Sequence, residues 1–214
     1  MLILFYLVLV EIASAQSSYT GFFPEAGITK NFGDRYGIFK IESQHELYKF
    51  NAEKERGLDY FHDRTDLQGF IGHQLNSHVK VAVGYQYRIQ PSMNNHRSIQ
   101  QVSWKSRLSR PIIDHRIRAD QTFEVNQPFQ WRIRYRFSYI HSYSESKYLL
   151  LSNEPIYALE GGISTYENRL VIAFGLKLPN GSKLQVGPDY RIDARFSEPI
   201  RTRLWWKAGW FIVL

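Results

Sequence analysis

The sequence QPFQWRIRYRFSYIH, residues 127–141, decides the fold class. Every odd-numbered residue from Phe129 to Tyr139 is aromatic or aliphatic, whereas Arg132, Arg134 and Arg136 occupy even-numbered positions. A helix would distribute the arginines around its circumference, but a β-strand places them together on one face. The stretch is therefore predicted to be a strand with one apolar face and one cationic face.

Composition supports a chain made of such strands. The 214 residues include 15% aromatics, yet the mean hydropathy is only −0.38, as expected when each strand is half apolar and half polar. No cysteine is present, which excludes a disulfide framework and a thiolate metal site. The net charge of +7 is spread along the strands, so nucleic acid is not an expected partner. The sequence contains no glycine-rich phosphate loop and no zinc-ligand spacing, so no cofactor is expected.

The N-terminal segment reads as a separate unit. Leu2 to Val10 is an apolar run of the length found in signal peptides, and Ala13-Ser14-Ala15 offers a small-residue cleavage site. We expect residues 1–15 to be a cleaved signal peptide and residues 16–214 to form one β-barrel domain; a buried N-terminal strand is the alternative. No cysteine follows the cleavage site, so lipoprotein anchoring is not expected.

The rest of the chain divides into eleven candidate strands separated by turn residues. They lie at about residues 18–30, 36–50, 60–74, 78–90, 101–108, 115–125, 127–141, 148–159, 170–178, 184–195 and 200–214. Bacterial outer-membrane barrels usually have even strand numbers. We therefore expect roughly 10–12 strands in an antiparallel up-and-down barrel, with ten or twelve favoured over eleven.

Two folds can accommodate these strands. In a transmembrane barrel the apolar faces meet lipid and the arginines line the lumen, whereas in a soluble sandwich the apolar faces form the core. Lipid exposure of the three arginines would cost about 2–4 kcal/mol each, so a membrane barrel must turn them inward. Strand length, aromatic residues near strand ends and a closing strand that is apolar up to Leu214 favour the transmembrane barrel.

The barrel interpretation predicts a polar network inside the lumen. Asp120 and Glu124 are expected to face the arginines of residues 132–136 across a hairpin. Glu154, just before Pro155, is interpreted in two ways. Either it points into the lumen and pairs with Arg134, Arg136 or Arg169, or it marks a bulge or edge distortion with a solvated carboxylate. The predicted lumen residues are Arg116, Arg118, Asp120, Glu124, Arg132, Arg134, Arg136, Asn153, Glu154 and Arg169.

Four short motifs give the chain a family resemblance. They are His115-Arg116-Ile117-Arg118, Trp131-Arg132-Ile133-Arg134-Tyr135-Arg136, Tyr148-Leu149-Leu150-Leu151-Ser152-Asn153-Glu154 and Glu167-Asn168-Arg169-Leu170. Together they resemble an uncharacterised family of Bacteroidetes-type outer-membrane β-barrels, a domain of unknown function. The resemblance implies a barrel in the outer membrane and carries no activity with it.

The function expected from the sequence is that of a small, non-enzymatic outer-membrane protein with a charged, occluded lumen. Its role would be structural or accessory, or it would bind a small ligand. Outer-membrane lipid and the barrel-assembly machinery are the expected partners. The alternatives are an outer-membrane hydrolase acting on lipid or lipopolysaccharide, with His115 or His141 beside a serine, and a soluble exported β-sandwich binding protein.

Overall fold

The computed structural model describes residues 17–51, 54–91, 93–107, 111–195 and 200–214. The expected signal peptide, residues 1–15, lies outside these ranges. The described residues form eleven strands and the turns between them, with no helix. The strands are β1 (Ser17–Phe32), β2 (Arg35–Asn51), β3 (Lys54–Gln74), β4 (Val79–Ile89), β5 (Asn95–Arg107), β6 (Ile112–Phe123), β7 (Gln130–Ser142), β8 (Lys147–Glu160), β9 (Ile163–Lys177), β10 (Lys183–Arg195) and β11 (Arg201–Val213).

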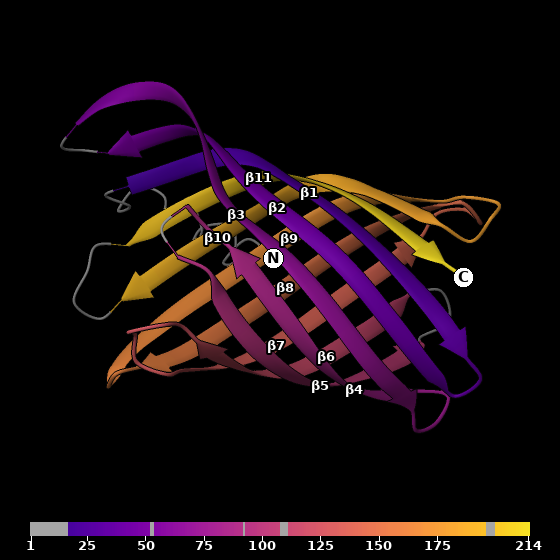
Figure 1. The fold of residues 1–214 in the computed structure, drawn as a ribbon. Coiled ribbons are helices and arrows are strands. Elements are labelled where there is room, and N and C mark those ends of the chain that lie inside the picture. Colours follow the sequence, from indigo (N-terminus) through magenta and orange to yellow (C-terminus); the bar gives the residue numbers. More distant parts are fainter. Residues whose placement is uncertain (1–16, 52–53, 92, 108–110, 196–199) are drawn as a thin grey trace.

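A single sheet closes on itself to form a barrel of tilted strands (Figure 1). Consecutive strands pair antiparallel, and β1 closes the barrel by pairing parallel with β11 from Ser17↔Arg201 to Thr29↔Val213. The predicted antiparallel up-and-down barrel is confirmed, whereas the two-sheet sandwich is wrong. The preference for an even strand number is also wrong. With eleven strands, the first and the last must run in the same direction, so the closing pair is parallel.

The hairpin of β2 and β3 extends beyond the rest of one barrel end (Figure 1). Strand β3 pairs with β2 as far as Lys54, but its pairing with β4 begins only at Thr65. Register shifts interrupt the β2–β3 ladder in this extension, and β-bulges of this kind bend a hairpin. The polar stretch 51–57, which lies between two of the candidate strands expected from the sequence, is therefore mostly strand within the described residues.

Alternation along each strand separates two environments. On β7, Trp131 and Ile133 are about half exposed on the outer face, at 47% and 51%, whereas Arg132 and Arg134 are buried at 9% and 7%. Strand β4 repeats the pattern, with Val83 at 61% outside and Gln86 at 2% inside. The predicted parity is confirmed: polar side chains fill the interior, and apolar side chains cover the outside.

Interior aromatic rings are seated on glycines of neighbouring strands. The ring of Tyr36 covers Gly72, that of Phe70 covers Gly84 and that of Tyr148 covers Gly175; a Cβ atom at any of these glycines would overlap the ring. Each of these rings therefore lies in close contact with the glycine backbone of a neighbouring strand.

Candidate lumen site

The interior faces of β6, β7 and β8 carry the densest group of charges. The register places Arg116 opposite Arg136 and Arg118 opposite Arg134. Like charges directly opposite one another destabilise a sheet. These four arginines therefore require carboxylates supplied from positions other than their direct cross-strand partners.

Asp120 supplies the first of these carboxylates. It lies opposite Arg132, as the sequence predicted, and is completely buried. Its Oδ2 accepts a hydrogen bond from Nη2 of Arg132 at 2.8 Å, and its Oδ1 accepts one from Nε of Arg118. Nη1 of Arg134 lies 3.7 Å from the same carboxylate. One aspartate thus stands among three guanidinium groups.

Glu154 supplies the second carboxylate, from β8. It points into the lumen and accepts hydrogen bonds from Nη2 of Arg134 at 2.6 Å and Nη2 of Arg116 at 2.7 Å. The pair with Arg134 was among the sequence expectations, whereas Arg116 lies two strands away and was not. The pairing of β8 with β7 and β9 passes Pro155 without a register shift, so the bulge alternative is wrong.

The remaining predicted residues have separate environments. Arg136 pairs with Asp114 at 3.5 Å, Arg169 pairs with Glu167 at 2.6 Å, and the Glu124 carboxylate accepts a hydrogen bond from Asn95 at 3.5 Å beyond the end of β6. Glu124 therefore belongs to the rim, away from the β7 arginines. The sequence reasoning missed Asp114 and Glu167, although each shares the parity of an arginine two residues further on.

Asn153 is not part of the lumen. It follows Ser152 and precedes Glu154, both buried in the interior, so strand alternation directs it outward. Its amide donates a hydrogen bond to Oδ1 of Asn168 on β9 at 3.0 Å. The prediction that Asn153 joins the lumen network is wrong, because adjacent residues of a continuous strand face opposite sides of a sheet.

The opposite wall carries charges that the sequence reasoning did not single out. Asp66 holds Arg88 through two hydrogen bonds of 2.6 and 2.8 Å, and Asp189 holds the fully buried Arg191 through two of 2.9 and 2.8 Å. The forks have the bidentate geometry of strong guanidinium–carboxylate pairs. Alternation places these residues in the interior, where Asp66 lies opposite Arg88 in the β3–β4 hairpin and Asp189 lies two residues before Arg191 on β10.

A cavity of about 380 Å³ lies between these walls. Eleven Lys and Arg side chains and six Asp and Glu side chains line it. Two contacts reach across the interior: Nη1 of Arg191 on β10 lies 3.5 Å from Oε1 of Gln44 on β2, and the Arg118 guanidinium lies 5.9 Å from the centre of the Phe70 ring. The interior is thus largely filled, and the space that is left is cationic.

A second polar cluster lies on the outer wall near the projecting hairpin. Oγ of Ser43 lies 2.8 Å from Nε2 of His45, whose Nδ1 lies 2.9 Å from the Tyr60 hydroxyl. The two histidines named as catalytic candidates have other partners. His115 forms a hydrogen bond with Tyr135 and stacks on Trp104, whereas His141 stacks on Tyr139 and meets Tyr143 edge-on. Within the described ranges, neither histidine has a hydrogen bond to a serine.

The described part of the chain contains no group of three or more His, Cys, Asp or Glu side chains arranged to hold a metal ion. It also contains no helix long and apolar enough to cross a membrane.

Comparison with known proteins assigns a family. Residues 20–200 match the family described as "Protein of unknown function (DUF2490)". The chain belongs to this family. All four motifs that carried the resemblance lie within the matched range, and the predicted membership of a domain of unknown function is confirmed. No curated protein and no solved structure matches the chain.

Proposed function

We propose that this DUF2490 barrel is an outer-membrane protein whose lumen is closed by ion pairs and serves a structural or small-ligand-binding role. The observation that supports it most strongly is the apolar outer face. A soluble monomer seldom exposes a continuous apolar patch above a few hundred Å². Here such residues cover the wall on nearly every strand, including Phe22, Ile71, Val83, Ile133, Phe174 and Trp206, all at least half exposed.

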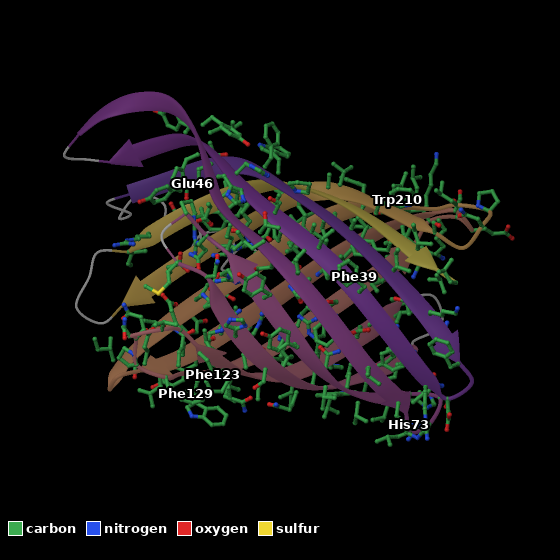
Figure 2. The ribbon with its side chains drawn as sticks, viewed as in Figure 1. Phe39, Glu46, His73, Phe123, Phe129 and Trp210 are labelled. Atoms are coloured by element: carbon green, nitrogen blue, oxygen red, sulfur yellow. The ribbon has the colours of Figure 1, made fainter. Side chains whose placement is uncertain are left out.

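The positions of the aromatic residues agree with a bilayer. Phe123 and Phe129 lie outside the wall near one end of the barrel, and Trp210 lies outside it toward the other (Figure 2). Aromatic side chains at both ends of an apolar band are typical of membrane interfaces. The outer face of β11 also stays apolar up to Leu214, the feature expected of the segment that the barrel-assembly machinery recognises.

The filled interior argues against a wide diffusion channel. Barrels with open aqueous channels have about 16–18 strands, whereas small barrels fill their interiors with side chains. The cross-lumen contacts and the shared carboxylates of Asp120 and Glu154 agree with the second class. Ligand binding would therefore be limited to molecules that fit the cationic cavity.

Fractionation of the exporting cell tests this proposal. The protein should be recovered in the outer membrane, and its gel mobility should shift on boiling, because folded barrels resist detergent below their unfolding temperature. Proteolysis or mass measurement of the mature chain should place its first residue at about position 16, after Ala15. Recovery as a soluble periplasmic protein would overturn the outer-membrane assignment.

A second candidate function is supported by the Ser43 cluster. In serine hydrolases a histidine accepts the nucleophile's proton while a third group holds the ring in position. His45 makes both kinds of contact here, with Tyr60 in the place that a carboxylate usually takes. An ester-hydrolysing site at the membrane surface would use Oγ of Ser43 to attack the carbonyl. The proton would pass to Nε2 of His45 and then to the departing alcohol, which leaves the acyl group on Ser43. A water molecule that gives its proton to His45 would then attack the acyl carbonyl, release the acid and return the proton to Oγ of Ser43.

Labelling with a fluorophosphonate tests the second candidate. The reagent should modify wild-type protein but not Ser43→Ala, whereas Ser98→Ala, which removes an outer-face serine from β5, should label normally. Equal labelling of Ser43→Ala, or no labelling of the wild type, would exclude Ser43 as a nucleophile.

A further inference from the structure

Arg97 on β5 is a buried cation with neutral partners. It is 2% exposed. Its Nε donates to Oγ1 of Thr122 at 2.8 Å, and its Nη1 lies 3.5 Å from Oε1 of Gln86. Among the described residues, no carboxylate lies within ion-pair distance of it. Arg191, which is equally buried, is held by a bidentate aspartate instead.

The charges around Arg97 do not compensate it. Arg132 and Arg88 are the charges that act on it most strongly, and both are cations. Asp120 acts in the opposite direction, but it already serves Arg118, Arg132 and Arg134. Removing an unpaired charge from water is strongly unfavourable unless a counter-charge is supplied. The site therefore favours binding of an anion.

The polar atoms around the same cavity have the matching chemistry. Arg97, Arg88, Arg132 and Gln86 all line it. Three buried nitrogen atoms have no hydrogen-bond acceptor among the described residues: Nε2 of Gln86, Nε of Arg132 and Nη2 of Arg118. All three are donors. A group that offers several acceptor oxygens and a negative charge satisfies donors of this kind.

We propose that the lumen binds a small oxyanion with the chemistry of phosphate, with Arg97 as its central ligand and Arg88, Arg132 and Gln86 beside it. This inference rests on the proposed ligand-binding role of the lumen and names the class of ligand. Guanidinium groups bind phosphate oxygens in bidentate geometry. A tetrahedral anion carries enough acceptor oxygens to bind several guanidinium groups at once, each from a different side. The cavity of about 380 Å³ accommodates such an ion or a phosphorylated head group.

The site lies close to one barrel end. Arg97 is the third residue of β5, and its partner Thr122 is the last residue but one of β6. Both strands have these residues at the end where the β2–β3 hairpin projects. A ligand from that side would reach Arg97 without crossing the ion pairs around Glu154. The phosphate could belong to a free ion or to a membrane lipid that inserts its head group at the rim.

Thermal unfolding of the full chain in uncharged detergent micelles tests the proposal. Inorganic phosphate should raise the temperature at which the folded gel band disappears, relative to sodium chloride of equal ionic strength. Arg97→Gln should weaken phosphate affinity, measured by calorimetry, at least tenfold. Lys105→Gln, which removes a cation from the exposed end of the same strand, should bind phosphate like the wild type.

The stability of Arg97→Gln in the absence of phosphate shows whether a loss of phosphate binding is caused by misfolding of the variant. Because the substitution removes an unpaired buried charge, this variant should be at least as stable as wild type in chloride and less stable than wild type in phosphate. Arg97→Lys, which retains the charge but loses the fork, should bind with intermediate affinity. No stabilisation of the wild type by phosphate, or equal affinity in Arg97→Gln, would overturn the proposal.

Dihexanoyl phosphatidic acid, compared with inorganic phosphate, distinguishes the two sources. Tighter binding of the lipid through Arg97 would identify a head-group site, and tighter binding of the free ion would identify a solute site. A wild-type protein that fractionates with the outer membrane but ignores both probes would refute only the anion site. A soluble protein that binds phosphate through Arg97 would refute only the membrane assignment.

Discussion

Replacing Glu154 with glutamine would remove one negative charge from between Arg116 and Arg134 without changing the shape of the side chain. In the folded barrel the carboxylate lies 2.7 Å from Arg116 and 2.6 Å from Arg134, and its own exposure is 7%. Removing one partner from a buried ion pair costs about 3–5 kcal/mol, because the remaining charge stays buried without compensation. Here two guanidinium groups lose a partner, while Arg134 keeps only a 3.7 Å contact with Asp120.

The assay is urea unfolding followed by the folded band on unheated gels. For a free energy of unfolding lowered by about 3–5 kcal/mol and a slope of about 2–3 kcal/mol per molar urea, the midpoint should fall by about 1–2.5 M. Glu154→Ala should lower it at least as far. The matched control is Glu160→Gln on the same strand, since Glu160 accepts a hydrogen bond from the neutral Gln130, at 2.7 Å, and has no cationic partner among the described residues.

A Glu154→Gln midpoint within about 0.3 M of wild type, a shift of less than about 1 kcal/mol, would refute the reasoning. It would mean that water or a bound anion solvates Arg116 and Arg134 as well as the carboxylate does. A larger decrease in the urea midpoint for Glu160→Gln than for Glu154→Gln would also contradict the reasoning. It would mean that the hydrogen bond of Glu160 with Gln130 stabilises the barrel more than the ion pairs of Glu154 do.

Three further predictions follow from the fold. Gly84→Ala should lower the free energy of unfolding by about 1–3 kcal/mol, because the new methyl group meets an aromatic ring, while Gly69→Ala, which meets nothing within 4 Å, should leave it nearly unchanged. Ile133→Arg, on the outer face of β7, should cost about 2–4 kcal/mol if that face meets lipid, and an unchanged urea midpoint would argue against lipid there. In this cysteine-free chain, Ser17→Cys and Leu214→Cys should react with impermeant maleimides from opposite sides of the membrane, because β1 and β11 run parallel; labelling from one side only would contradict the eleven-strand closure.

Much of the fold was predictable because strand alternation is a local property. The parity that placed Arg132 and Arg134 opposite Trp131 and Ile133 does not depend on which strands are neighbours, so the inner and outer faces could be assigned before any pairing was known. The same rule places the adjacent residues Asn153 and Glu154 on opposite faces. The prediction that both face the lumen was therefore inconsistent with alternation. The strand that was hardest to recognise, β1, is held in place by its neighbours β2 and β11, despite its weak sequence pattern.

The pairing of charges was predictable only in part. Asp120 lies opposite Arg132 because the two residues belong to one hairpin, whose register follows from its turn. Glu154 reaches Arg116 across an intervening strand, and this contact requires the curvature of the closed wall. The sequence did not distinguish Arg97 from the other arginines. Its neutral partners, Gln86 on β4 and Thr122 on β6, are known only once the side chains of three adjacent strands are placed.

The sequence by itself therefore determined the all-β class and the inner and outer faces, because alternation with a period of two acts within each strand. Only the tertiary structure decided the parallel closure of β1 on β11, the meeting of arginines across β6 and β7, and the cationic cavity around Arg97. These features depend on register and curvature, which bring together residues from different strands. A slip of two residues between strands would preserve every face and change every charge pair that joins two strands.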